Sequence, residues 1–209
     1  RRRLPNRFSF DEPAVEGAIH DSASAALAVA SRSPFFFDHL EQLSLQALDE
    51  FSKHFQRSYS CLEENAVLDA EHLIVLHGEI PQVLKDELAQ RREQRQKVGI
   101  LRLLRLRPFP GAELASRLSG KKTVTVLEPS ASPTASDPPL LRDLSSALSR
   151  AEENGRLGHA FHPNYPLLPE GLRPLLLGAN NVAGTSGMSR EEVKAVFENM
   201  QLSEPRKSF

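Results

Sequence analysis

The feature that most constrains the fold is an alternation of short apolar runs with helical stretches between residues 73 and 127. Leu73–Leu76, Val98–Leu104 and Thr123–Leu127 are short, rich in aliphatic and β-branched residues, and typical of buried strands. Helical periodicity fills the stretches between them, over Ile80–Gln96 and Gly111–Leu118. Neighbouring parallel strands need a crossover that is usually a helix, so this order predicts three adjacent parallel strands. We therefore predict an α/β domain with a three-layer, Rossmann-like, mainly parallel sheet that carries helices on both faces.

The amino-terminal part does not show this alternation of strand-like and helical stretches. Ser22–Ser31 is rich in small residues and has no amphipathic stripe, and Pro34 marks the start of an amphipathic helix that ends near Gln56–Ser60. The chain begins with three arginines and no Met, and it stops at Phe209 soon after a helix and a proline. We expect it to be a fragment of a longer protein.

The carboxyl-terminal part contains three further elements. Pro129–Pro139 has the Ser, Pro, Thr and Asp content of a surface loop, and Leu140–Asn154 has helical periodicity. Leu172–Leu177 is predicted as one more strand. Ser189 and Glu192 have the spacing of a capping box, which predicts that a last helix begins there.

Composition excludes several functional classes. The formal net charge is -1, so the basic footprint of a general nucleic-acid-binding protein is missing. No run of about 18 apolar residues is present, so we expect no membrane span. Cys61 is the only cysteine, which excludes an internal disulfide and any cysteine-only zinc or iron–sulfur site held by this chain alone. We expect a reducing compartment, the cytoplasm or an organelle matrix.

Ligands of open α/β sheets bind beyond the carboxyl ends of the strands, and the segments there carry no catalytic signature. Gly78 lies between a strand and a helix, where backbone N–H groups could meet an anion, but no glycine-rich phosphate fingerprint surrounds it. A local basic run also ends at this edge, and within it Arg105 and Arg107 are the candidates for contact with an anion or an acidic partner. The run comprises Arg91, Arg92, Arg95, Lys97, Arg102, Arg105 and Arg107.

Metal binding and nucleophilic catalysis have little support. His159 and His162 are three residues apart, but the surrounding residues are not helical in pattern and no second ligand pair accompanies them. Cys61 has Glu63 and Glu64 close by, and neighbouring carboxylates raise the pKa of a thiol. We therefore assign no catalytic residue and no metal ligand to this chain.

Several segments together resemble one protein family. The strand Val98–Arg102, the corner Arg107–Pro110, the helix Glu113–Leu118 and the strand Thr123–Leu127 are similar to the transketolase C-terminal-like domain of pyruvate:ferredoxin (flavodoxin) oxidoreductases. The flanks extend the resemblance, which covers about four fifths of the chain. They are Phe35–Tyr59, Asp69–Val75 and Gly184–Met200 with the final residues.

The resemblance implies a structural part of a multidomain oxidoreductase. In that family thiamine diphosphate and iron–sulfur clusters are bound by other domains, and this domain supports packing and the dimer, so no cofactor is expected in this chain. It implies an extended segment, 1–33, that comes from a preceding domain, a transketolase C-terminal-like α/β domain, 34–178, and an exit segment with a helix, 179–209, toward a following domain. The expected partners are other domains or subunits of the same oxidoreductase, as a homodimer.

Polar residues ahead of the first helix and after the third predicted strand depart from the family pattern and leave alternatives open. His20–Ala23 and Ala30–Ser33 stand where relatives that act on 2-oxoacids carry Asn-Pro-Asp and Gly-Arg-Glu, and Glu128–Pro133 stands where they carry Asp-Arg-Thr-Lys-Glu-Pro. This favours a relative that kept the scaffold, such as the corresponding region of an assimilatory sulfite reductase subunit, with flavin or sirohaem elsewhere in that protein. A free-standing protein-binding module is the remaining alternative.

Overall fold

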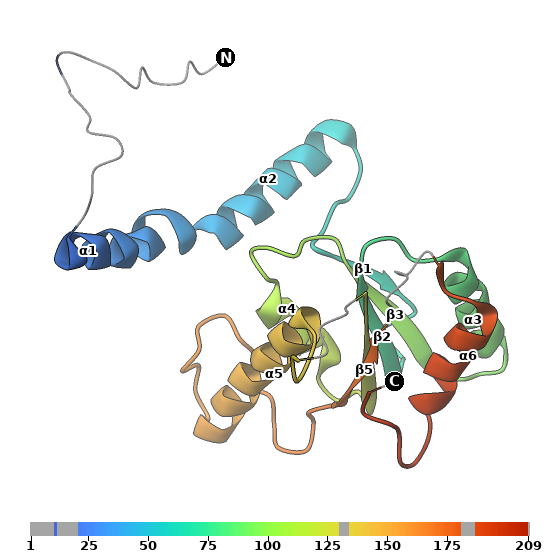
Figure 1. Cartoon of the computed structure of the whole chain (residues 1–209). Coiled ribbons are helices and arrows are strands. Elements are labelled where there is room, and N and C mark those ends of the chain that lie inside the picture. Colours follow the sequence, from blue (N-terminus) through green and yellow to red (C-terminus); the bar gives the residue numbers. More distant parts are fainter. Residues whose placement is uncertain (1–10, 12–20, 130–133, 181–186, 209) are drawn as a thin grey trace. The chain divides into compact units, whose positions relative to one another are not determined.

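The computed structural model describes residues 11, 21–129, 134–180 and 187–208 (Figure 1). The chain divides into two compact units, residues 1–47 and 48–209. The loop predicted over 129–139 is described except for residues 130–133. Gly184 lies outside the described residues.

The first unit is helical where the structure describes it. It contains α1 (Ser22–Arg32), a short π-helix (Ser33–Phe37) and the first half of α2 (Leu40–Phe55). The sequence predicted an extended segment over 1–33, and α1 corrects this for its described part. The reason is local, because alanines favour a helix strongly and the carboxylate of Asp21 accepts a hydrogen bond of 2.7 Å from the backbone N–H of Ser24.

The second unit begins within α2. Near the end of that helix the rings of Phe51 and Phe55 have centroids 4.3 Å apart, and the Tyr59 ring lies 5.0 Å from Phe51. Leu48, on the same helix, packs against the domain core. The amphipathic helix predicted from Pro34 to about residue 56 is confirmed over Leu40–Phe55.

The second unit is built on a five-stranded sheet with the order β1-β3-β2-β4-β5 (Figure 1). The three central strands β3, β2 and β4 are parallel and adjacent, as the alternation predicted, and β5 adds in parallel beyond β4. β1 pairs with β3 in antiparallel orientation. The strands are β1 (Leu62–Asn65), β2 (His72–His77), β3 (Val98–Leu103), β4 (Thr123–Glu128) and β5 (Leu175–Asn180).

Helices cover both faces of this sheet, so the predicted three-layer α/β architecture is confirmed. Figure 1 shows α4 and α5 on one face, and α3 and α6 on the other. The helices are α3 (Gln82–Glu93), α4 (Gly111–Leu118), α5 (Pro139–Leu157) and α6 (Arg190–Asn199). The capping box at Ser189 and Glu192 is present, with both reciprocal hydrogen bonds.

Alternation along the strands divides the core into two apolar clusters. On β2, Leu73 and Val75 face α4 and α5, whereas Ile74 and Leu76 face α3 and α6. All four side chains are fully buried, as expected for a parallel sheet covered on both sides.

Two strands differ from the prediction. β1 was missed, because its four residues are mostly polar and it is defined by pairing with β3, about 40 positions away in the sequence. The last strand was predicted over Leu172–Leu177 and is found over Leu175–Asn180. Its register follows from pairing with β4, where Leu175 lies opposite Thr123. Within the residues described, no helix is both long enough and apolar enough to cross a membrane.

Candidate functional site

A crevice lies at the carboxyl edge of the sheet, where open α/β folds bind their ligands. The chain moves from β2 outward to β3 and then crosses to the other side of β2 to form β4, so the strand order reverses between β2 and β4. Two hollows of about 160 and 280 Å³ occur at this edge and share Met188. Their linings are Leu127, Ala179, Asn180, Met188, Glu192, Ala195 and Val196 in the first, and Glu79, Pro81, Gln82, Val83 and Met188 in the second.

The lining of the crevice is mostly apolar, with two carboxylates, Glu79 and Glu192, and two side-chain amides, Gln82 and Asn180. Glu192 is committed to the helix cap, since its Oε2 accepts a hydrogen bond of 2.7 Å from the backbone N–H of Ser189. That hydrogen bond lowers the pKa of Glu192. Glu79 lies ahead of α3. The lining residues that the structure describes include no histidine, cysteine, serine or lysine, so none of them is a nucleophile with an adjacent base.

Arg107 was predicted to contact an anion, and the structure gives it an acidic partner within the chain. Its Nη2 donates to Asp143 Oδ2 at 2.6 Å, its Nη1 donates to the Leu106 carbonyl at 2.8 Å, and its guanidinium lies 5.8 Å from the ring centre of Phe109. The Arg107–Pro108 peptide bond is cis. An external anion at Arg107 would have to compete with Asp143.

Arg105 and Gly78, the other two predicted contact residues, each have a hydrogen-bond partner of their own within the chain. Arg105 Nε donates to the Pro108 carbonyl at 3.1 Å. Gly78 adopts a φ of +100°, which fits the tight turn expected of a glycine after a strand, and its carbonyl accepts from Arg102 Nη1 at 3.4 Å. Anion contact at Arg105, Arg107 and Gly78 stays a prediction.

The basic run is largely neutralised by acids that come from elsewhere in the sequence. Most of its members form an ion pair with a carboxylate, and several of these partners lie more than 20 positions away. Sequence reasoning missed these partners because they are distant along the chain. The pairs are Arg91–Glu87, Arg92–Asp69, Lys97–Glu71, Arg102–Glu63 and Arg107–Asp143.

Glu71 is the most strongly perturbed carboxyl group of this network. Its two oxygens accept from Lys97 at 2.8 Å and from Lys122 at 2.5 Å. The hydrogen bonds from Lys122 and Lys97 lower the pKa of Glu71 from 4.5 to about 2. This cluster lies at the amino ends of β2, β3 and β4, at the edge opposite the crevice.

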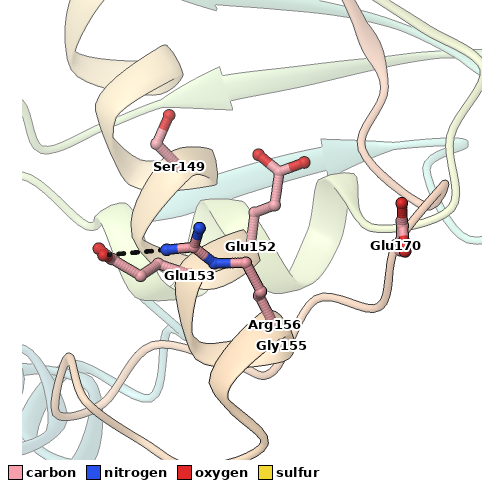
Figure 2. A pocket seen from close by; sticks show the side chains of 6 residues that line it. All are labelled: Ser149, Glu152, Glu153, Gly155, Arg156 and Glu170. Atoms are coloured by element: carbon pink, nitrogen blue, oxygen red, sulfur yellow. Dashed lines mark ion pairs between the residues drawn. The ribbon is translucent and has the colours of Figure 1, made fainter.

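A hollow of about 700 Å³ lies along α5 and was not predicted from the sequence (Figure 2). Figure 2 shows Glu152 and Arg156 on α5 and Glu170 on the segment opposite. The carboxylates on the helix have basic partners: Arg173 lies 2.8 Å from Glu152, and Arg156 lies 3.6 Å from Glu153. The lining is Ser149, Glu152, Glu153, Gly155, Arg156 and Glu170.

The segment opposite α5 is fastened to it by Asn154, which is fully buried. Its Nδ2 donates to the carbonyls of His162 and Tyr165 at 3.0 Å, and its Oδ1 accepts from the backbone N–H of His162 at 2.8 Å. His162 Nε2 lies 2.7 Å from Glu153 Oε2, and this contact lowers the pKa of Glu153. Of the His159/His162 pair of the sequence, His162 is thus part of the contacts that hold this segment on α5.

No cluster of three or more His, Cys, Asp or Glu side chains with metal-binding geometry occurs in the part of the chain that the structure describes. Cys61 is 1% exposed. The residues described therefore do not fit a cysteine-bound iron–sulfur cluster.

Comparison with known proteins identifies a family domain within the second unit. Residues 70–158 match the family model described as pyruvate:ferredoxin oxidoreductase core domain II. The match includes β2, α3, β3, α4, β4 and α5. It therefore covers both sides of the strand-order reversal.

Curated relatives agree with this match. Pyruvate synthase subunit PorA of Thermotoga maritima is 31% identical over 135 residues, which are 59% of this chain and 34% of that protein. The probable pyruvate-flavodoxin oxidoreductase of Escherichia coli is 24% identical over 203 residues, 95% of this chain and 16% of that protein. The pyruvate-flavodoxin oxidoreductase of a Nostoc species is 28% identical over 174 residues, 80% of this chain and 37% of that protein. The chain thus spans between 16% and 37% of the length of these relatives.

Proposed function

Residues 70–158 form a core domain II of the pyruvate:ferredoxin oxidoreductase family, and from this premise we propose that the chain is a supporting domain of a multidomain 2-oxoacid oxidoreductase. In this role the chain positions other domains, which bind thiamine diphosphate and the iron–sulfur clusters. The enzyme acts as a homodimer in the cytoplasm or an organelle matrix.

The observation that carries this proposal is the chemistry of the crevice. It occupies the edge at which α/β enzymes keep their reacting groups, yet its described lining is apolar apart from Glu79, Asn180, Gln82 and the capping Glu192. An apolar surface with a few polar groups is suited to packing against another protein surface. The described lining residues do not form the set of acid, base and nucleophile that a reaction centre needs.

The helices at the amino-terminal end add independent support. Their apolar side chains are largely exposed in this chain, for example 73% for Phe35, 66% for Phe36 and 59% for Phe55. Exposed aromatic side chains of this kind, taken for each unit by itself, are suited to contact with another protein surface. The relatives are three to six times longer than the region they share with this chain, so other domains are available to cover it.

Kinetics of the whole oxidoreductase test the proposal. We expect Asn180→Ala and Glu79→Gln, both in the crevice, to change kcat for pyruvate oxidation by no more than about threefold. Phe51→Ser and Phe55→Ser should instead lower the yield of the assembled dimer, because a polar hydroxyl replaces apolar contact area of about 100 Å² or more at each site. Lys53→Ser, on the same helix with its side chain in solvent, is the matched control.

Two results would reject the proposal. One is a loss of about a hundredfold in kcat in a crevice variant that keeps its dimer and its thiamine diphosphate content, because this would place a reacting group in the crevice. The other is a whole protein that contains flavin or sirohaem in place of thiamine diphosphate, which would assign the chain to a sulfite reductase.

A further inference from the structure

The irregular segment that packs on α5 determines the residue type at position 154 of the helix. Asn154 is 0% exposed, and its side-chain amide donates to the carbonyls of His162 and Tyr165 and accepts from the N–H of His162. We call these three hydrogen bonds the clamp. An aspartate has no donor for the two carbonyls, so the clamp needs an amide at this position.

The same segment determines the residue type at position 155. A Cβ built on Gly155 would lie 1.9 Å from the Leu168 carbonyl oxygen and 2.6 Å from its carbonyl carbon. The Leu168 N–H donates to the Ala151 carbonyl at 2.9 Å, so the segment lies directly against the backbone of the helix. Packing therefore requires an asparagine followed by a glycine, a pair that the chain contains once.

An asparagine that precedes a glycine is the asparagine most open to deamidation. The backbone nitrogen of the following residue attacks the side-chain carbonyl carbon, and a glycine leaves that nitrogen unobstructed and its backbone free to turn. A new C–N bond closes a succinimide ring while the C–N bond of the side-chain amide breaks, and the amide leaves as ammonia with the proton of the attacking nitrogen. Water then opens the ring and leaves an aspartate or an isoaspartate.

The folded chain keeps the two reacting groups out of this geometry. The clamp holds the amide of Asn154, and Gly155 lies within α5, where backbone N–H groups are engaged in the helical ladder. Water is close by, because Gly155 lines the hollow of about 700 Å³ (Figure 2). Both residues belong to the last turn of α5, and helix ends open more easily than helix centres.

We propose that Asn154 is a site of spontaneous deamidation, and that its rate is set by opening of the segment 159–168 from α5. The product cannot rebuild the clamp, because a carboxylate offers no donor to the two carbonyls and places a negative charge opposite them. The modification therefore releases the segment permanently. This inference does not depend on the oxidoreductase role, since it concerns the lifetime of the folded second unit.

Peptide mass spectrometry of the whole protein, sampled during a long incubation at mildly alkaline pH, measures the rate at Asn154. We expect conversion to be about a hundredfold or more faster in urea than in the native protein. Leu168→Ala removes the buried side chain that anchors the segment, and should speed conversion in the native protein by about tenfold or more. Leu167→Ala, at the exposed neighbouring leucine, is the matched control and should leave the rate unchanged. Equal rates in urea and in the native protein would overturn the proposal.

A second leucine separates local opening from global unfolding. Leu84 is fully buried in the apolar cluster on the opposite face of the sheet, so Leu84→Ala lowers the overall stability without touching the segment. We expect the rate at Asn154 to stay unchanged in this variant. Equal acceleration by Leu84→Ala and Leu168→Ala would assign the rate to global unfolding, and would overturn the proposal.

If Leu168→Ala does not fold, His162→Ala decides. It removes only the contact of 2.7 Å between His162 Nε2 and Glu153 Oε2, and we expect a rise in rate of about threefold. His159→Ala is its control, because the His159 side chain contacts the Leu157 carbonyl and not Glu153. An unchanged rate in His162→Ala would then overturn the proposal.

Asn154→Asp reproduces one product of the reaction and tests its consequence. We expect hydrogen exchange at the Leu168 amide to be about tenfold or more faster in this variant. Asn164→Asp adds the same charge at an exposed position of the same segment and should leave that exchange unchanged. Unchanged exchange at Leu168 in Asn154→Asp would show that a carboxylate fits the clamp, and would overturn the proposal.

Discussion

Two threonines on β4 offer a matched test of how this core is stabilised. Thr123 and Thr125 are two positions apart, so their side chains lie on the same face of the sheet, and they are 6% and 0% exposed. The hydroxyl of Thr123 donates to the Met200 carbonyl at 2.9 Å and lies 2.7 Å from His72 Nδ1. The hydroxyl of Thr125 is buried and has no hydrogen-bond partner in the described part of the chain.

The two substitutions by valine are therefore expected to have opposite signs. A buried hydroxyl without a partner costs about 1–3 kcal/mol, so Thr125→Val should raise the free energy of unfolding by about 1–2 kcal/mol. Thr123→Val removes one partner from each of two hydrogen bonds, so it should lower that free energy by about 1–3 kcal/mol. Both changes replace an OH with a methyl group of similar size.

Urea unfolding followed by circular dichroism measures both effects. We expect the midpoint to rise for Thr125→Val and to fall for Thr123→Val, with the same m-value, because the surface exposed on unfolding is unchanged. A lower midpoint for Thr125→Val at an unchanged m-value would show that its hydroxyl has a partner, and would refute the reasoning.

Three further predictions concern single residues. Glu128→Gln should lower the free energy of unfolding by about 1 kcal/mol, seen as a lower melting temperature, because both carboxylate oxygens of Glu128 accept from the Leu140 N–H at 3.0 Å at the start of α5. Glu71→Gln should destabilise the protein at pH 7. Because the pKa of Glu71 is lowered from 4.5 to about 2 in the folded state, the deficit should shrink between these pH values in urea titrations. Gly155→Ala should cost about 2 kcal/mol or more in urea unfolding, although alanine favours helices, because its Cβ would lie 1.9 Å from the Leu168 carbonyl oxygen.

A control or a contradicting outcome accompanies each of these three substitutions. Asp137→Asn, just ahead of α5, should leave the melting temperature unchanged if Glu128 is the cap. A deficit of Glu71→Gln that stays the same from pH 4.5 to pH 2 would contradict the lowered pKa of Glu71. A stabilising Gly155→Ala would mean that the segment at Leu168 does not pack closely on α5.

The central strands could be predicted because their pattern is local. Leu73–Leu76 and Thr123–Leu127 are short, apolar and bounded by turn residues, and a helix lies between each pair of strands. β1 could not be predicted in this way, because Glu63 and Glu64 give it no apolar pattern. It is set by its pairing with β3.

The candidate site was less accessible from sequence than the fold. Arg107 was correctly placed beyond the carboxyl end of a strand, but its partner Asp143 lies 36 positions away, and nothing in the sequence shows that the two meet. The hollow along α5 depends on Asn154 holding an irregular segment, which has no periodic signature. Contacts between distant residues are what the sequence pattern does not reveal.

The central claim is that this chain supports an oxidoreductase and leaves cofactor binding to other domains. Hydrogen exchange of the whole protein, with and without thiamine diphosphate and Mg²⁺, tests it most directly. The account predicts that the cofactor slows exchange in other domains and leaves the crevice amides of Leu127, Asn180 and Met188 unchanged. Slower exchange at those three amides on adding the cofactor, at a saturating concentration, would contradict it.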